Sequence, residues 1–273
     1  MEQNKRISQI IIITCALILS LFLFSKIKNT SPEQTIPQNQ LPLPNELIKQ
    51  EELLNNQSKN TENKSSEKPL LESLPSKVDI PVPFTPQAPF AVWDDDHNEA
   101  CEEAALIMAK HFQDNTPLDK ETAEVEILDS IAWQKTNWNG HFNLSAEKIV
   151  QLAETYFKIK NIYLEKNPSI EDIKRHLAKG EIIIAPTYGR ELKNPYFRGQ
   201  GPIYHALIIR GYNKDKFITN DPGTKRGEKF IYSQSNLYNA IHSWPGEFQK
   251  HYSEQEAVQL IKQGEKTIIV VGK

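Results

Sequence analysis

Residues 204–223 read YHALIIRGYNKDKFITNDPG, and this stretch decides how the part of the chain around it folds. Two apolar runs of strand length are separated by the short polar turn Asn213–Asp215. Such a pattern predicts two antiparallel strands joined as a hairpin. The start of the first strand would then lie beside the end of the second. We therefore expect the side chains of His205 and Asp221 to meet.

The segments on either side of this hairpin have two different periodicities. Apolar residues at helical spacing predict helices over residues 101–112, 120–133, 146–157, 169–179 and 253–263. Further strands are predicted over residues 181–185, 229–232 and 266–271. Ser169 with Asp172, and Ser253 with Glu256, have the spacing of a capping box at a helix start. Helices first and strands afterwards indicate an α+β domain.

The first 28 residues predict a membrane anchor. An uncharged run of 18 residues extends from Ile7 to Phe24, about the minimum length that crosses the hydrocarbon core of a bilayer. The run ends in Phe-Leu-Phe-Ser-Lys and lacks the small residues of a signal-peptidase site. We predict an uncleaved signal anchor over residues 1–28, with a transmembrane helix at about 7–24. A cleaved signal peptide and a buried core helix are the alternatives.

Residues 29–77 contain no glycine and no aromatic residue and are rich in Pro, Gln, Asn, Ser, Glu and Lys. Such a composition cannot bury enough apolar surface to offset the entropy of ordering, so a disordered polar linker is predicted. Residues 78–273 suffice for one substantial core and form the predicted folded domain. An N-terminal anchor would export that domain, so we expect a single-pass protein of the cell membrane with its folded domain extracytoplasmic.

Composition and motifs exclude several classes of function. The 273 residues carry a net charge of −3 with no long basic run, which gives no electrostatic footprint for nucleic acid. No GxGxxG, P-loop or CxxC pattern is present, so no nucleotide or iron–sulfur cofactor is predicted. Asp94–His97 reads as a solvated acidic turn, with a calcium or zinc site as the alternative. We predict neither a cofactor nor a metal.

Cys101 is the candidate nucleophile. It opens a predicted helix, where unpaired amides and the helix dipole stabilise a thiolate. A cysteine nucleophile needs a base that takes its proton and a third group that orients the base, and His205 and Asp221 supply both. The connection 188–204, rich in Gly and Pro, leads directly into His205 and is either a cleft wall or an ordinary loop. The other cysteine, Cys15, lies in the apolar run of the anchor.

Four motifs in this order resemble the papain-like cysteine peptidases related to the double-glycine leader peptidases, peptidase family C39. They are Val82-Pro-Phe-Thr-Pro-Gln-Ala-Pro, Cys101 at a helix start, Tyr204-His-Ala-Leu-Ile-Ile-Arg-Gly-Tyr and Ile218-Thr-Asn-Asp-Pro-Gly, and the resemblance spans about Ile80 to Trp244. It implies a papain-like fold, with a helical first half packed on an antiparallel sheet. It also implies that Cys101 is the nucleophile, His205 the general base and acid, and Asp221 the group that orients His205. Gln87 would donate a hydrogen bond to the oxyanion.

The resemblance implies a cysteine peptidase that hydrolyses peptide or isopeptide bonds through a thioester, and the predicted anchor would make it membrane-anchored and extracytoplasmic. Its partners would be the membrane and a peptide or protein substrate, with cell-wall peptides among the candidates. One departure is clear, because the family commonly has Cys-Gly-Pro where this chain has Cys101-Glu-Glu. Two nearby carboxylates would disfavour a thiolate. The alternatives are therefore a catalytically weak or inactive papain-like surface module that binds peptide or cell-wall ligands, and a cell-wall peptide hydrolase.

Overall fold

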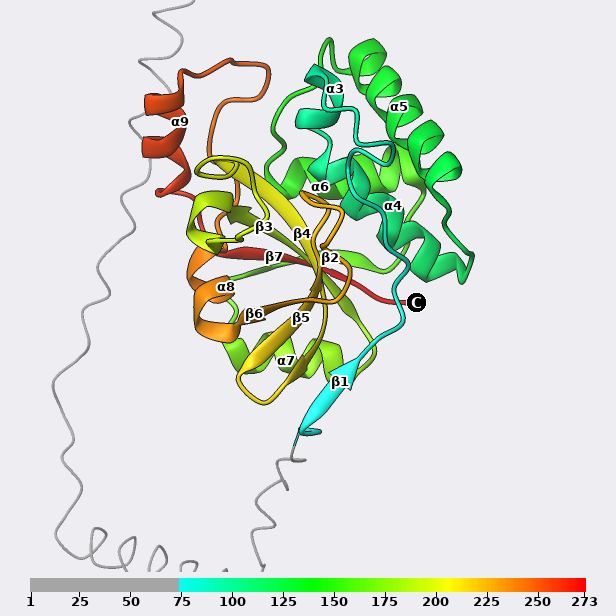
Figure 1. Ribbon diagram of the computed structural model, residues 1–273, viewed down its shortest axis with the longest axis vertical. Coiled ribbons are helices and arrows are strands. Elements are labelled where there is room, and N and C mark those ends of the chain that lie inside the picture. Colours follow the sequence, from blue (N-terminus) through cyan, green and yellow to red (C-terminus); the bar gives the residue numbers. More distant parts are fainter. Residues whose placement is uncertain (1–73) are drawn as a thin grey trace, which may run out of the picture. The chain divides into compact units, whose positions relative to one another are not determined.

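The computed structural model of the protein describes residues 74–273 (Figure 1). The predicted signal anchor and nearly all of the predicted linker lie outside these residues. Between residues 74 and 273 no helix is both long enough and apolar enough to cross a membrane. The folded part begins slightly before the predicted boundary at residue 78. The carbonyl of Pro75 accepts a hydrogen bond of 2.8 Å from the Tyr212 hydroxyl, and Lys77 is already in a strand.

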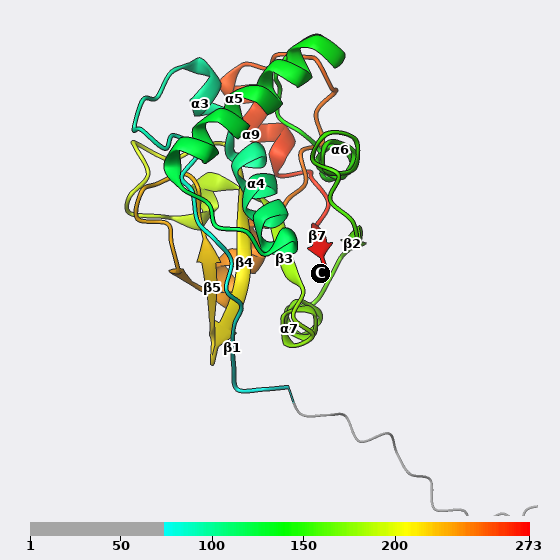
Figure 2. The same cartoon turned by 90° about the vertical axis from the view of Figure 1, so that its right-hand side faces the viewer.

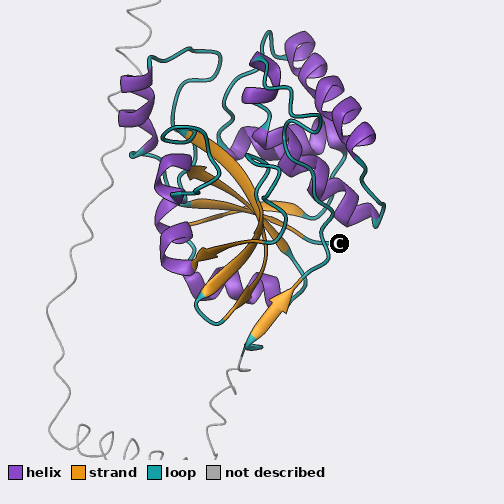
Figure 3. Ribbon diagram, in the orientation of Figure 1, coloured by secondary structure: helices purple, strands orange, loops and turns teal. Residues whose placement is uncertain are grey.

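An antiparallel sheet forms the centre of the described part (Figures 1 and 3). Its strand order is β2 (Ile162–Lys166), β7 (Thr267–Val271), β3 (Ile182–Tyr188), β4 (Tyr204–Asn213), β5 (Lys216–Asn220) and β6 (Phe230–Ser233), and β1 (Lys77–Asp79) pairs with β4. All pairings between these strands are antiparallel. The strands β3, β4 and β7 are buried along nearly their whole length, because helices and loops cover both faces of the sheet there.

Helices cover the sheet and one another. They are α3 (Asp95–Asn98), α4 (Cys101–Asp114), α5 (Lys120–Asn137), α6 (Ala146–Leu152), α7 (Ile170–Ala178), α8 (Gln234–Ala240) and α9 (Glu254–Ile261), with a π-helical turn at Ala153–Phe157 and a 3-10 turn at Gly189–Leu192. Figure 2 shows α4 alongside β4, and α5 packs in turn on α4. The helix α4 is buried on almost every side, unlike an ordinary amphipathic surface helix. The predicted α+β class, with helices packed on an antiparallel sheet, is confirmed.

The hairpin β4–β5 forms as its sequence predicts. Asn213 pairs with Lys216, and Lys214 adopts the left-handed backbone conformation that the tight turn requires, with φ of 53°. A bulge between Ile209 and Gly211 shifts the register of the two strands. Any side chain at Gly211 would clash with the Val78 carbonyl, so only glycine lets β1 pair here. Both predicted capping boxes are present, at the starts of α7 and α9.

Candidate active site

The hairpin β4–β5 brings His205 and Asp221 together. His205 is the second residue of β4, and Asp221 directly follows β5. The Nε2 atom of His205 lies 2.7 Å from the Oδ1 atom of Asp221, and both side chains are buried. An ionised carboxylate only accepts hydrogen bonds, so this contact requires a hydrogen on Nε2. In a neutral imidazole, Nδ1 is then the nitrogen that can accept a proton.

Asp221 is held by four hydrogen-bond donors. Its Oδ1 atom accepts from His205 and, at 2.9 Å, from the main-chain N–H of Gly223. Its Oδ2 atom accepts from Tyr232 Oη at 2.6 Å and from Asn194 Nδ2 at 3.0 Å. Burial by itself would raise the pKa of this carboxyl, but the charge of His205 and these hydrogen bonds lower the pKa below its ordinary value. The site therefore fixes a carboxylate, and the carboxylate fixes the ring of His205.

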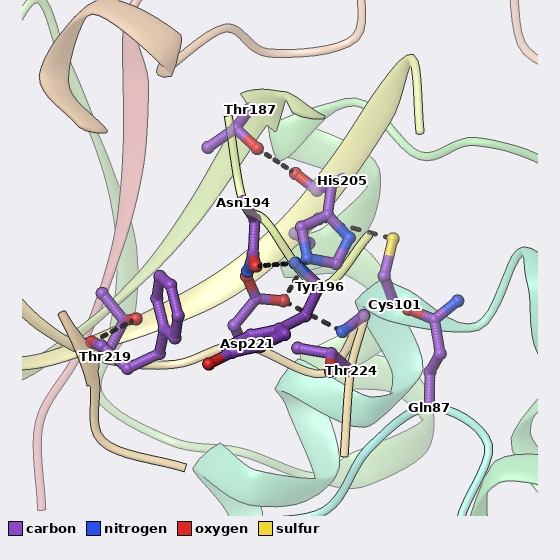
Figure 4. Close-up of polar contacts among 12 residues, drawn as sticks. Gln87, Cys101, Thr187, Asn194, Tyr196, His205, Thr219, Asp221 and Thr224 are labelled. Atoms are coloured by element: carbon purple, nitrogen blue, oxygen red, sulfur yellow. Dashed lines mark hydrogen bonds and ion pairs between the residues drawn. The ribbon is translucent and has the colours of Figure 1, made fainter. Parts of the chain in front are cut away.

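The sulfur of Cys101 lies on the other side of this imidazole. Figure 4 shows the ring of His205 between the Cys101 sulfur and the Asp221 carboxylate. The Sγ atom accepts a hydrogen bond of 3.4 Å from the main-chain N–H of Ala206, the residue after His205. Among residues 74–273 the Nδ1 atom of His205 has no hydrogen-bond partner, so it is free to accept a proton. The structure thus brings together the three residues that the sequence analysis selected.

Glu102 is the nearest hydrogen-bonding neighbour of that sulfur. The thiol of Cys101 donates to Glu102 Oε2 at 2.8 Å, and Glu102 Oε1 accepts from the Leu144 main-chain N–H at 3.0 Å. Burial, together with the nearby charge of Glu103, raises the pKa of Glu102 to about 8. Burial, the charge of Glu102 and the hydrogen bond to it raise the pKa of the Cys101 thiol well above its ordinary value. The resting thiol is therefore protonated, and Glu102 is mostly neutral below about pH 8 and ionised above it.

Glu103 extends this buried polar cluster away from the sulfur. Its Oε1 atom accepts from Gln134 Nε2 at 2.5 Å and lies 3.3 Å from His141 Nε2. Burial disfavours a charge on His141, but Glu103, with smaller contributions from Glu102 and Asp96, outweighs burial and raises the pKa of His141 to about 9. Glutamate side chains are almost never fully buried unless they are paired. The structure buries both, with exposed fractions of 1% and 0%.

The side-chain amide of Gln87, drawn in Figure 4, is already engaged. The Nε2 atom donates to the carbonyls of His97 at 2.8 Å and Asn98 at 3.1 Å, in the segment just before α4. Its Oε1 atom is buried without a partner among the described residues. Donation to an oxyanion, the role predicted for Gln87, requires one of these two hydrogen bonds to be exchanged for the substrate.

The acidic turn Asp94–His97 serves a structural purpose. Asp94 caps α3, and the buried ring of His97 lies 2.7 Å from Asp94 Oδ1 and 3.2 Å from Glu124. The turn is less solvated than predicted, because His97 is only 3% exposed. Within residues 74–273 no group of three or more His, Cys, Asp or Glu side chains could hold a metal ion.

Sequence reasoning did not select Asn194, Tyr232 or the buried position of Glu102 as parts of the site. Asn194 belongs to the connection that leads into His205, which the sequence analysis left open between cleft wall and ordinary loop. Its Nδ2 atom donates to both Asp221 and the Tyr232 hydroxyl, so this connection supports the site. Tyr232 lies in β6, the strand that follows Asp221 in the chain, and this proximity was the available signal.

Comparisons with known proteins found one matching family model and several similar solved structures. The sequence profile of the Peptidase C39-like family matches residues 80–249. A protein from Bacillus anthracis described as C39-like is 17% identical with a TM-score of 0.44, and the match covers 72% of this chain and 98% of that one. A fragment of prointerpain A from Prevotella intermedia, with a cysteine-to-alanine substitution, is 15% identical with a TM-score of 0.43, covering 86% and 87%. No curated protein matches this chain.

Proposed function

Because the chain belongs to the Peptidase C39-like family, we propose that it is an active cysteine peptidase whose nucleophile is Cys101. His205 would act as general base and acid, and Asp221 would orient His205. The family that the sequence motifs predict is confirmed by the match over residues 80–249, and the described domain is of the cysteine peptidase type. The proposal adds the triad, the reaction and the location of the protein.

One observation carries the proposal: the ring of His205 lies between the Asp221 carboxylate and the Cys101 sulfur (Figure 4). The carboxylate holds Nε2 of the imidazole at 2.7 Å and leaves Nδ1 as the free basic nitrogen. The Cys101 sulfur is held by the Ala206 amide next to that ring. A base oriented by a third group and placed beside a thiol is the arrangement that cysteine nucleophiles require.

The proposed reaction begins when Nδ1 of His205 takes the thiol proton. The thiolate attacks the substrate carbonyl carbon, a C–S bond forms, and the carbonyl oxygen becomes an oxyanion. The Cys101 main-chain N–H lies in the first turn of α4, where it has no partner within the helix, and it would donate to this oxyanion. His205 then gives its proton to the leaving amine as the C–N bond breaks. Water, activated by His205, hydrolyses the thioester.

We also propose that the domain acts outside the cytoplasm, tethered to the cell membrane by residues 1–28. The uncharged run from Ile7 to Phe24 supports this location. The substrates would be peptide or isopeptide bonds in proteins or in cell-wall peptides. No cofactor, metal or nucleic acid takes part in the proposed reaction.

The test compares the full-length protein with Cys101→Ala, using a peptide library, peptidoglycan fragments and a thiol-directed active-site probe. Wild type is expected to cleave peptides and to be labelled, and Cys101→Ala is expected to lose both signals. Cys15→Ala is the matched control and should keep both, since this residue lies in the predicted anchor. Equal labelling of wild type and Cys101→Ala would refute the proposal. Cleavage confined to peptidoglycan fragments would identify a cell-wall peptide hydrolase instead.

The raised pKa of Cys101 favours one alternative, a non-catalytic module that binds peptide or cell-wall ligands. In such a module the thiol would stay protonated at neutral pH and react no faster than a free cysteine. A thiol pKa well below the free value of about 8.5, measured by pH-dependent alkylation in the wild type, would exclude this alternative.

A further inference from the structure

Glu102 contacts the reacting atom of the proposed peptidase and has no part in the proposed triad. Its Oε2 atom is 2.8 Å from the Cys101 sulfur, closer than any other hydrogen-bonding atom described around that sulfur. The side chain is only 1% exposed, so its position is fixed by protein contacts. The Leu144 main-chain N–H, at 3.0 Å, holds the other carboxyl oxygen.

We propose that Glu102 is a further catalytic residue, which controls the proton of Cys101 by its own protonation state. As a carboxylate, Glu102 accepts the thiol hydrogen and holds the sulfur in its unreactive form. As a carboxylic acid, Glu102 donates its Oε2 hydrogen to the sulfur and stabilises a thiolate. This inference rests on the proposed function, since it concerns the nucleophile of that reaction.

The protons balance between the two states. The blocked state holds a carboxylate, a thiol and a neutral imidazole, with a total charge of −1 on these three groups. Uptake of one proton from solvent by Glu102 removes the acceptor of the thiol hydrogen. The thiol proton then passes to Nδ1 of His205, which leaves a carboxylic acid, a thiolate and an imidazolium with a total charge of zero. No bond other than those to hydrogen changes.

The surroundings of Glu102 favour its neutral form. Glu103, next to it on α4, adds a second negative charge, while His141 from the loop before α6 balances Glu103 at 3.3 Å. On β4 the buried Tyr204 faces the cluster, and its hydroxyl donates to the Leu144 carbonyl at 2.6 Å. Two carboxylates and one imidazolium give a net negative cluster inside the protein. A buried cluster of this kind takes up a proton more readily than exposed carboxylates do, and Glu102 titrates at a pKa of about 8.

The experiment measures how fast iodoacetamide, a neutral reagent, alkylates Cys101 in the full-length protein at about pH 6.5 and about pH 9.5. Mass spectrometry of the peptide that contains Cys101 separates this reaction from alkylation of Cys15. For wild type, ionisation of Glu102 at about pH 8 should suppress the reaction at the higher pH. In Glu102→Gln the amide still donates to the sulfur and accepts from Leu144, but it cannot ionise. The ratio of Glu102→Gln to wild-type rate should therefore rise at least tenfold between the two pH values, since one pKa unit changes the thiolate fraction tenfold.

Glu103→Gln is the matched control, since it replaces the neighbouring buried carboxyl and leaves the contact with the sulfur intact. Loss of the Glu103 charge lowers the pKa of Glu102, so suppression should begin at a lower pH than in wild type. Glu102→Gln thus removes the suppression of alkylation at high pH, whereas Glu103→Gln extends that suppression to lower pH. A ratio that stays constant with pH, or a shift of both variants in the same direction, would overturn the inference.

Infrared spectroscopy and the comparison with peptide cleavage provide two further tests. If Glu102→Gln fails to fold, infrared spectra of the wild type should still show a protonated carboxyl that titrates near pH 8, and its absence above about pH 6 would overturn the inference. Alkylation needs no substrate, so the result does not depend on peptide cleavage. If the protein cleaves peptides but the ratio of Glu102→Gln to wild-type alkylation rates stays constant with pH, the inference about Glu102 is refuted and the peptidase proposal stands. A protein that cleaves none but shows the rising ratio refutes the peptidase proposal and supports proton control by Glu102.

Discussion

Replacing Tyr232 by phenylalanine should destabilise the protein by an amount that depends on the charge of Asp221. The Tyr232 hydroxyl donates to Asp221 Oδ2 at 2.6 Å in a buried setting. A hydrogen bond to a charged group contributes about 1.5–3 kcal/mol, so we expect Tyr232→Phe to lower the free energy of unfolding by about 2 kcal/mol at pH 7. About 1 kcal/mol of this loss remains when the carboxyl is neutral, so the difference of about 1 kcal/mol corresponds to a rise of about 0.7 units in the pKa of Asp221, at about 1.4 kcal/mol per unit.

The pH dependence follows from the direction of that pKa. Asp221 has a lowered pKa in the folded protein, so its contribution is present above the unfolded value of 3.8 and is lost as pH falls through the folded pKa. Below both values the carboxyl is neutral, and the lost hydrogen bond is then an ordinary one of about 1 kcal/mol. The destabilisation caused by Tyr232→Phe should therefore be smaller at a pH below the folded pKa of Asp221 than at pH 7.

Urea unfolding at the two pH values measures this difference, with Tyr204→Phe as the matched control. Tyr204 is also buried and donates at 2.6 Å, but to the neutral carbonyl of Leu144. The control should lose about 1 kcal/mol, equally at both pH values. The reasoning is refuted if Tyr232→Phe costs no more than Tyr204→Phe at pH 7, or if its cost is the same at both pH values.

Two further predictions concern the position of His205 and the buried cluster. In Gly223→Ala the new Cβ would lie 2.7 Å from Phe197 Cε1 and 2.9 Å from His205 Cε1, so the imidazole must move. Alkylation of Cys101 at pH 7 should therefore slow by about tenfold or more. Gly180→Ala is the control, because a Cβ added at Gly180 has no atom within 4 Å while the backbone φ is +84°. This variant should lose about 1 kcal/mol of stability and keep the alkylation rate of the wild type. Equal slowing of alkylation in both variants would contradict the account. The free energy of unfolding of the wild type should fall as pH rises from about 5 to about 9. Glu102, with a pKa of about 8, and His141, with a pKa of about 9, hold protons in the folded state that the unfolded chain releases around 4.5 and 6.5. Urea titrations that show rising stability over this range would contradict the buried cluster.

Local patterns in the sequence predicted much of the fold. The hairpin β4–β5, the strands β3 and β7 and both capping boxes depend on residues close together in the chain, and each formed as expected. Strand β2 was not predicted, because it lies at the edge of the sheet and leaves Tyr163 44% exposed, which blurs the apolar pattern. Helix α8, with the sequence QSNLYNA, was also missed, because its polar residues are weak helix formers and Ser233 caps it from outside.

The candidate active site was likewise predicted in part from local sequence. The meeting of His205 and Asp221 followed from the hairpin, because 16 residues and one turn separate them. The burial of Glu102 did not, because it depends on Leu144, 42 residues further along the chain. Two acidic residues in a first helical turn normally lie in water and favour the helix dipole. The packing of the loop before α6 and of α5 against α4 converts them into a buried pair beside the nucleophile.

The central claim is that His205 activates Cys101, and one measurement tests it most directly. The rate at which iodoacetamide alkylates Cys101 is compared at pH 7 between wild type and His205→Ala. A free cysteine is only a few per cent thiolate at this pH, and the burial and charge around Cys101 lower that fraction further. If His205 takes the thiol proton, the alanine variant should react about 100-fold or more slowly than wild type. Equal rates in the two folded proteins would contradict the account.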